Sequence, residues 1–275
     1  MLFNINMKIM PVDTSHANKP IFQSSFRIYF PKQVKNFDIF GCNKVRTSTN
    51  LFREDLDWVE LVYYMKHHFK NKDSVNTCSL ACSDGSEAFT FAISVFENLP
   101  ENIQAKFLPI HASDIDEEIL KAAKSGRINI DTIEFLLAER MYNCDIEKYF
   151  NKPSASIIIK GDEISETDTI SSYQVEQKLR NAVKFKKSDI LTELNNLKDN
   201  GNSVILCRNV FPYLSQKYTD KVIETAQKKL KKGSLFIIGD YDGKVSMEQK
   251  LFANGFCHPV LNSKCVNGNN IFIRI

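Results

Sequence analysis

The chain has 275 residues, of which 43% are hydrophobic and 25% charged, and its formal net charge is +3. This length suits one large α/β domain or two small ones, and the composition is ordinary for a soluble globular protein. So small a net charge, carried by dispersed basic residues, does not indicate nucleic-acid binding. The densest basic run, Lys228 to Lys232, ends a predicted helix, where cations complement the helix dipole.

The cysteines and histidines do not predict a metal site. The seven cysteines form no CxxC pair, so we interpret them as buried, reduced thiols of a cytosolic protein. His67 and His68 are adjacent, so on a helix they point in different directions and cannot bind one metal ion. No stretch approaches the length of a membrane-spanning helix, which predicts a cytoplasmic protein without membrane insertion.

The chain is predicted to have an aromatic-rich N-terminal segment, residues 1–46, followed by one main domain, residues 47–275. Residues 1–46 are irregular and punctuated by prolines, but too apolar for a disordered tail, so we expect them to pack on the main domain. Residues 56–65 follow with apolar positions near the 3.6-residue period of a helix.

From there, predicted strands alternate with predicted helices. This alternation predicts an α/β fold with a Rossmann-like, doubly wound, mostly parallel sheet. The predicted strands are Val75–Ala81, Phe107–Ala112, Val183–Phe185, Val204–Cys207 and Leu235–Ile238, and the predicted helices are Glu87–Leu99, Asp116–Lys124 and Gln216–Leu230.

Two regions depart from this alternation. Phe256–Leu261 and Asn270–Ile275 predict a C-terminal antiparallel hairpin, with Asn267-Gly268 as its turn. At about residues 154–177, a β-prone run, Ile157–Lys160, predicts a small β insertion. The run is followed by a linker with four acidic residues, Asp162, Glu163, Glu166 and Asp168.

The loop after the first predicted strand, Cys82 to Glu87, has a single glycine and is a weak signal for nucleotide binding. By itself it favours an ordinary turn, with Asp84 or Ser86 as a helix cap.

The segment after the second predicted strand is more informative. Asp116 is explained as the N-cap of the next helix, whereas Asp114 lies before that helix begins. A carboxylate at this strand end can accept hydrogen bonds from both hydroxyls of an adenosine ribose.

Two further polar motifs flank this region. Arg208 and Asn209 follow the fourth predicted strand, so they face the same edge of the sheet as Asp114. The alternative is a solvent-exposed loop in which Tyr213 packs on a helix. The segment from Thr47 to Arg53 is by itself only a polar loop with helix-capping potential.

Together these motifs carry a resemblance that none carries alone. In chain order they read TxTxxFR, ACSxGxE, ASDID, FxxxDI and CRNVxxY, beginning at residues 47, 81, 112, 185 and 207. This series resembles the CheR-type chemotaxis protein-glutamate O-methyltransferases, which are class I S-adenosylmethionine-dependent enzymes. The similarity runs from about Thr47 to Ile238 and so covers most of the chain.

The resemblance implies S-adenosylmethionine as cofactor and S-adenosylhomocysteine as product. It implies that Asp114 holds the ribose and that Tyr213 lies beside the methyl donor. The implied cofactor-binding residues are Thr47, Thr49, Arg53, Glu87, Asp114, Asp189, Ile190, Arg208 and Asn209, and the implied catalytic residues are Arg53 and Tyr213. The implied partner is a protein substrate, such as the cytoplasmic domain of a chemoreceptor, and not a nucleic acid.

The chain also departs from the family pattern. Thr47 and Asp189 stand where the family usually has Asn, and Ser86 stands where it has a second Glu. We expect residues 1–46 to stand where the family has a helical N-terminal domain, which is linked to receptor recognition.

The implied reaction needs little from the protein beyond alignment. A methyl group on a sulfonium is already activated, so the acceptor must be placed in line with the S–CH₃ bond. A glutamate carboxylate, with a reference pKa of about 4.3, is ionised at neutral pH and needs no general base. Arg53 could then orient the carboxylate.

Three functions compete. The first is a protein-carboxylate methyltransferase, the second a small-molecule methyltransferase of the same fold, and the third a non-catalytic module that binds S-adenosylmethionine. Arg53 and Tyr213 argue against the third. The predicted insertion favours a protein partner, because in the family a small β insertion docks a receptor peptide.

Overall fold

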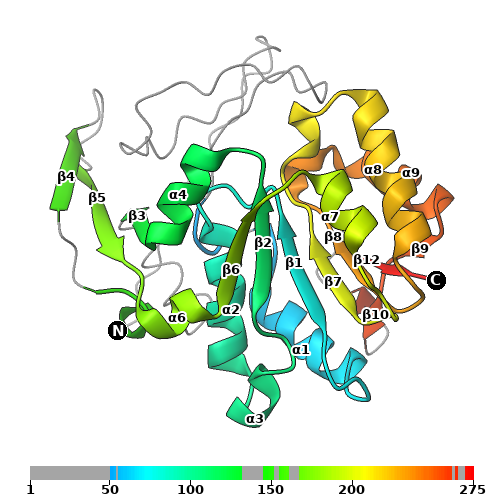
Figure 1. Cartoon of the computed structure of the whole chain (residues 1–275), viewed down its shortest axis with the longest axis horizontal. Coiled ribbons are helices and arrows are strands. Elements are labelled where there is room, and N and C mark those ends of the chain that lie inside the picture. Colours follow the sequence, from blue (N-terminus) through cyan, green and yellow to red (C-terminus); the bar gives the residue numbers. More distant parts are fainter. Residues whose placement is uncertain are drawn as a thin grey trace, which may run out of the picture.

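The computed structural model of the chain describes residues 50–53, 55–131, 145–151, 155–160, 167–261, 264–265 and 270–275 (Figure 1). The sequence expectations for the N-terminal segment 1–46, for Thr47 and Thr49, for the turn Asn267-Gly268, and for Asp162, Glu163 and Glu166 fall outside these ranges. The division of the chain into residues 1–46 and 47–275 stays a prediction.

A seven-stranded sheet forms the centre, with strand order β6-β2-β1-β7-β8-β12-β9 (Figure 1). The first five strands in this order pair in parallel, whereas β12 pairs antiparallel with both β8 and β9. The predicted doubly wound, mostly parallel sheet is thereby confirmed. The strands are β1 Asn76–Leu80, β2 Ile110–Asp114, β6 Val183–Lys187, β7 Ser203–Leu206, β8 Leu235–Ile237, β9 Phe256–Cys257 and β12 Ile271–Arg274.

Alternating side chains of the central strands build two separate cores. Val204 and Leu206 on β7 pack on one face of the sheet, and Ile205 on the other. Strand β8 alternates in the same way, with Leu235 and Ile237 opposite Phe236. Because successive side chains of a strand point to opposite faces, a strand covered on both faces is apolar at nearly every position, as β8 is.

Helices cover both faces (Figure 1). Apolar residues of α1, α2 and α4 join the first core, and those of α7, α8 and α9 join the second. The helices are α1 Trp58–His68, α2 Ser86–Asn98, α3 Glu101–Gln104, α4 Glu117–Ser125, α6 Gln177–Asn181, α7 Ile190–Asn196, α8 Gln216–Lys229 and α9 Lys244–Ala253, and the 3₁₀ turns are η1 Ile146–Lys148, η2 Phe211–Tyr213 and η3 Asp240–Asp242.

Side-chain caps fix where several helices begin. The carboxylate of Asp116 accepts from Glu118 N (2.9 Å) and Ile119 N (3.3 Å), as the sequence predicted. Such a cap satisfies backbone N–H groups that the first turn leaves without partners.

The prediction was wrong at the start of the second strand, which begins at Ile110 and not at Phe107. Pro109 lacks the N–H that a paired strand position would donate.

The predicted insertion is present and larger than expected. It is a three-stranded antiparallel sheet in the order β3-β5-β4, with β3 Arg127–Asp131, β4 Ala155–Lys160 and β5 Thr167–Gln174. The predicted C-terminal strand Phe256–Leu261 splits. Its first two residues form β9, and its last two form β10 (Val260–Leu261), which pairs with β11 (Lys264–Cys265).

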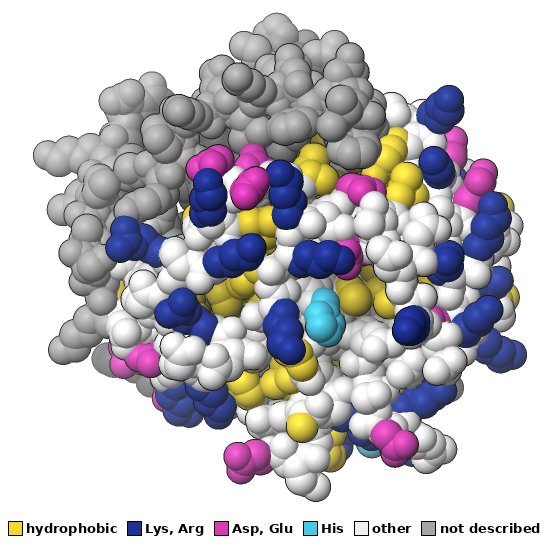
Figure 2. All heavy atoms as spheres, viewed as in Figure 1, with side chains coloured by type: hydrophobic (Ala, Val, Ile, Leu, Met, Phe, Trp, Pro, Cys, Tyr) yellow, Lys and Arg dark blue, Asp and Glu magenta, His cyan; other side chains and the backbone are white. Residues whose placement is uncertain are grey.

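Charged side chains are scattered over the face of the molecule seen in Figure 2, where Lys and Arg lie among Asp and Glu. Within the described ranges, no helix is long and apolar enough to cross a membrane. The same residues contain no group of three His, Cys, Asp or Glu side chains that could hold a metal ion.

Candidate functional site

A cavity lies over the carboxyl ends of β1, β2, β6 and β7. Its empty volume, including the part that is open to solvent, is about 1080 Å³. Strand β1 sits between β2 and β7, so the chain's direction of winding reverses there. Ligands of doubly wound sheets bind at this reversal. The cavity wall includes every predicted site residue that the structure describes: Arg53, Glu87, Asp114, Asp189, Ile190, Arg208, Asn209 and Tyr213.

The loop after β1 is bent by backbone conformations that are rare outside glycine. Ala81 and Ser83 have φ of 56° and 53°. Gly85 has φ of 88°, and a Cβ there would lie 2.7 Å from the ring of Phe185, so glycine is required. Left-handed backbone at non-glycine residues is costly and clusters at ligand sites. The loop therefore holds a shape that its own sequence does not favour.

Asp114 ends β2 and is 7% exposed. Its carboxylate accepts from the backbone N–H of Ser83 (2.8 Å) and of Asp116 (2.9 Å). Burial raises the pKa of Asp114 above its ordinary value, although these two backbone bonds oppose the shift. A carboxylate has about four lone-pair sites, so Asp114 can still accept a hydrogen bond from a ligand.

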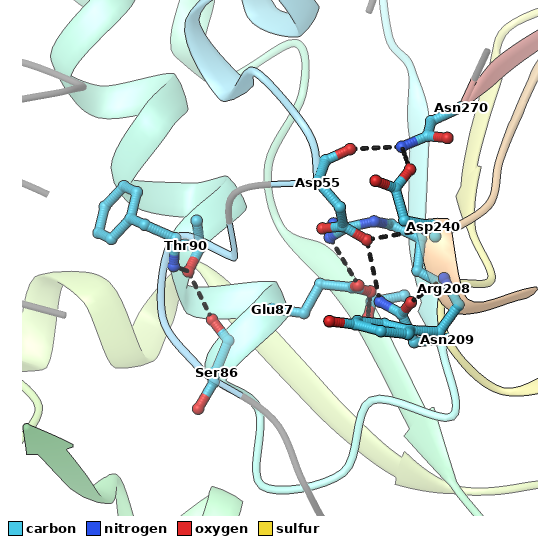
Figure 3. Close-up of polar contacts among 12 residues, drawn as sticks. Asp55, Ser86, Glu87, Thr90, Arg208, Asn209, Asp240 and Asn270 are labelled. Carbon is cyan, nitrogen blue, oxygen red and sulfur yellow. Dashed lines mark hydrogen bonds and ion pairs between the residues drawn. The ribbon is translucent and has the colours of Figure 1, made fainter. Parts of the chain in front are cut away.

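Arg208 lies at the centre of a buried ionic cluster (Figure 3). One terminal nitrogen of its guanidinium pairs with Asp55 and the other with Glu87 (3.0 Å). The side chains of these three residues are only 1%, 6% and 14% exposed, in the order Arg208, Asp55, Glu87. Glu87 also accepts from the hydroxyl of Ser79 (2.7 Å), and the Arg208 guanidinium lies 5.0 Å from the centre of the Trp58 ring.

This arrangement gives Arg208 a structural task that the sequence did not suggest. Its two terminal nitrogens are engaged by protein carboxylates, and its buried Nε has no partner among the described residues. Removing one partner of a buried ion pair costs about 3–5 kcal/mol, because the other charge stays buried. Arg208 thus builds the cavity wall by joining Glu87 to Asp55.

Asn209 is held in a left-handed conformation, with φ of 57°. Its N–H donates to Asp242 (2.7 Å), which also accepts from the N–H of Gly239 (2.7 Å) and of Phe211 (3.0 Å). Burial raises the pKa of Asp242 to about 6. Asp242 therefore clamps the loop after β7 to the loop after β8.

Asp189 and Ile190 lie where β6 leads into α7. Asp189 is the N-cap of α7 and accepts from Thr192 N (3.0 Å), a structural role that the sequence analysis did not consider. Tyr218, also in the cavity wall, donates its hydroxyl to Asp189 at 3.4 Å. Ile115, Ile119 and Ile190 contribute apolar surface to the cavity wall.

Sequence reasoning missed several residues of this site. Asp55 had no signal, because its partner Arg208 is 153 positions away. Trp58, the single tryptophan of the chain, lines the cavity as the first residue of α1. Asp242 carried a signal of the kind used for Asp114, since the acidic Gly239-Asp240-Tyr241-Asp242-Gly243 directly follows an apolar strand.

Fold and site together define a class. A doubly wound sheet whose last strand, β12, inserts antiparallel beside β8 is combined with a buried carboxylate at the end of the second strand. With a cavity at the winding reversal, this is the architecture of the Rossmann-like S-adenosylmethionine-dependent methyltransferases.

The family follows from comparison with known proteins. The family model of the CheR methyltransferase SAM-binding domain matches residues 47–257, and the chain belongs to this family. S-adenosylmethionine is accordingly its cofactor. The residues present fit it, because Asp114 has acceptor capacity left, and Ser83, in the cavity wall, has a buried hydroxyl without a partner among the described residues.

Curated relatives are similar over part of their length. A chemotaxis protein methyltransferase of Listeria monocytogenes is 24% identical over 169 residues, which are 62% of this chain and 54% of that protein. Chemotaxis protein methyltransferase 2 of Vibrio cholerae is 25% identical over 161 residues, 58% of this chain and 49% of that protein. The chain thus spans about half the length of the curated relatives it matches.

Solved structures give only a distant likeness. Magnesium protoporphyrin IX methyltransferase of Synechocystis with bound SAM aligns with a TM-score of 0.38 at 12% identity, covering 79% of each chain. Monomeric WbdD aligns with a TM-score of 0.41 at 9% identity, covering 90% of this chain and 47% of that one. At this distance neither structure bears on the roles of individual residues.

Proposed function

We propose that the chain transfers a methyl group from S-adenosylmethionine to a glutamate carboxylate of a partner protein. Membership of the CheR methyltransferase family supports the transfer. The observation that carries the choice of acceptor is the composition of the cavity wall. Arg53 and Tyr213 share it with Asp114 and Glu87, and no His or Lys is among the residues described there.

The cofactor-binding residues would divide between the two ends of the cavity. Asp114 would accept hydrogen bonds from the ribose hydroxyls, and Ile115, Ile119 and Ile190 would offer apolar surface to the adenine. Glu87, at the start of α2, would face the methionine portion together with Arg53. The bound cofactor would supply an activated methyl group on its sulfonium.

A carboxylate acceptor explains why this wall can work without a basic imidazole or amine. Glutamate is ionised at neutral pH and already nucleophilic, so no proton must be removed. Arg53 would bind the acceptor carboxylate, since a guanidinium pairs with it through two parallel N–H···O bonds. Tyr213 would donate to the carboxylate and fix its orientation. The aligned placement of acceptor and donor then provides the catalysis.

The names of the curated relatives, chemotaxis protein methyltransferases, support a chemoreceptor cytoplasmic domain as the partner. The insertion β3-β5-β4 supports a protein acceptor over a small molecule, since it adds a separate sheet beside the methyltransferase core.

The chemistry of the product tests the proposal. Purified protein, incubated with a cell extract and methyl-labelled S-adenosylmethionine, should attach label to proteins. Mild alkali should release that label as volatile methanol, because esters hydrolyse where N-methyl groups survive. The control is Asp114→Ala, which should attach much less label at the same cofactor concentration.

Label that resists alkali, on lysine or arginine, would contradict the glutamate assignment. Label confined to small metabolites would identify a small-molecule methyltransferase. Binding of S-adenosylhomocysteine by calorimetry with no transfer to any acceptor would identify a non-catalytic binding module.

A further inference from the structure

Asn50 and Arg53 line the cavity, and a contact of the neighbouring Phe52 fastens this segment to α2. The backbone N–H of Phe52 donates to the hydroxyl of Thr90 (3.0 Å), and that hydroxyl donates to the carbonyl of Ser86 (2.8 Å). Thr90 is 0% and Phe52 2% exposed, so water does not compete for this bond. Phe52 has φ of 47°, an unfavourable conformation that the surrounding contacts must hold.

A second contact fastens the same segment to the other side of the cavity. Asp55 pairs with Arg208 and accepts from Asn209 Nδ2 (3.2 Å) and Asp240 N (3.1 Å). Its carbonyl accepts from the side-chain amide of Asn270. Figure 3 shows both contacts, with Thr90 and Ser86 on one side and the Asp55 cluster on the other. The segment therefore bridges α2 and the loops after β7 and β8.

Arg53 lies between the two contacts, one residue after Phe52 and two before Asp55. Neighbouring Cα atoms are 3.8 Å apart, so Arg53 cannot shift far from the cavity while both contacts hold. We propose that Thr90 and Asp55 are positioning residues that hold Arg53 against the bound cofactor from opposite sides. The proposal rests on the cofactor-facing role of Arg53 given above.

The first test is amide hydrogen exchange of residues 50–57, read by mass spectrometry. Thr90→Val removes the hydroxyl at nearly constant shape, and Asp55→Asn removes the charge that pairs with Arg208. Thr90→Val should speed exchange in this segment about tenfold, the loss of roughly one buried hydrogen bond. Asp55→Asn should speed it by more, because it also weakens the buried ion pair with Arg208. Thr90→Ser keeps the hydroxyl and should restore slow exchange.

Two matched controls lie at the other end of the parallel strands, where these strands begin. Thr77 is also 0% exposed and donates to the carbonyl of Phe107 at 2.6 Å, so Thr77→Val deletes an equally buried hydroxyl. Asp199 is 8% exposed and accepts several hydrogen bonds, so Asp199→Asn matches Asp55→Asn. Neither control should change exchange in residues 50–57.

The second test is a double-mutant cycle on the affinity for S-adenosylhomocysteine, measured by calorimetry. Thr90→Val should weaken binding about five- to tenfold when Arg53 is present and less than about twofold in an Arg53→Ala background. Equal weakening in both backgrounds, or no effect of Arg53→Ala itself, would overturn the proposal. Because no acceptor takes part, this result is independent of whether glutamate is the methylated residue.

Discussion

Buried aspartates lie at both ends of the parallel strands of the central sheet, but their roles differ. We call the end where these strands begin the amino edge, and the end where they finish, beneath the cavity, the carboxyl edge. At the amino edge, Asp199 accepts from Gly201 N (3.1 Å), Ser203 Oγ (2.7 Å) and Ser234 Oγ (2.8 Å). These bonds join the beginnings of β7 and β8. Neither Asp199 nor the two serines has a buried polar atom left without a partner.

At the carboxyl edge, several residues have unfavourable backbone conformations or buried polar atoms without partners among the described residues. Every described non-glycine residue with positive φ lies there: Phe52, Ala81, Ser83 and Asn209. Five described side chains there also have a buried polar atom without a partner among the described residues: Trp58, Ser83, Ser113, Arg208 and Asn270.

The difference separates a structural edge from a binding edge. Strain and unpaired polar atoms cost stability, and a fold keeps them where a ligand gains from them. We therefore expect substitutions at the amino edge to lower stability alone, and substitutions at the carboxyl edge to lower cofactor affinity. The following variants test this division.

The largest effect should come from Asp114→Ala compared with Asp199→Ala. Loss of charge-assisted hydrogen bonds to the ribose, at about 1.5–3 kcal/mol each, predicts at least tenfold weaker binding of S-adenosylhomocysteine by calorimetry. Asp199→Ala should unfold at a lower urea concentration and bind with unchanged affinity. Equal losses of affinity in the two variants would erase the distinction between the edges.

Because of Asp242, the free energy of unfolding should fall as the pH rises. An acid whose pKa is raised from 3.8 to about 6 keeps its proton in the folded state where the unfolded chain has lost it. Its stabilising contribution is full below about pH 4 and is lost as the pH rises through 6, by about 3 kcal/mol. Urea unfolding at several pH values should show this decline relative to Asp242→Asn. Parallel curves for the two proteins would contradict the assignment.

Arg53→Ala should separate catalysis from cofactor binding. If Arg53 holds the acceptor as well as bordering the cofactor, methyl transfer to extract proteins should fall about 10- to 100-fold and cofactor affinity by less. Arg274→Ala is the control, because Arg274 donates to Gly255 O (2.7 Å) at the amino edge. Equal losses of transfer and affinity would mean that Arg53 serves the cofactor alone.

A smaller effect should appear in the pH dependence of binding. Burial raises the pKa of Asp114, and hydrogen bonds from ribose hydroxyls favour its charged form. Affinity should therefore be full above the pKa of the free protein and decline as the pH falls through it. Calorimetry at successively lower pH should show this decline in the native protein. An equal loss in Asp114→Asn would show that another group is responsible.

Much of this fold could be predicted from the sequence, because it depends on local patterns. The apolar runs of β1, β7 and β8 and the N-cap Asp116 lie within a residue or two of their predicted positions. The second strand was misplaced at Pro109, where the apolar pattern continues but a donor is missing. Helices α3, α6, α7 and α9 were not predicted. The four or five residues of α3 and α6 are too few to show a period.

The site was predicted less completely, for a physical reason. Asp114 and Arg208 stand at strand ends, where position alone suggests a role. Asp55 and Asp242 act through distant partners, the guanidinium of Arg208 and the backbone N–H groups of a neighbouring loop. A sequence shows neither kind of contact before the strand order is known.

Hydrogen exchange with and without S-adenosylhomocysteine tests the division between the two edges most directly. We predict slower exchange in the loops at residues 81–87, 114–116, 188–190 and 208–214, which contribute the cavity wall. Residues 198–203 and 231–234, at the amino edge, should exchange equally fast with and without the ligand. Protection confined to the amino edge, or spread evenly over both edges, would contradict the account.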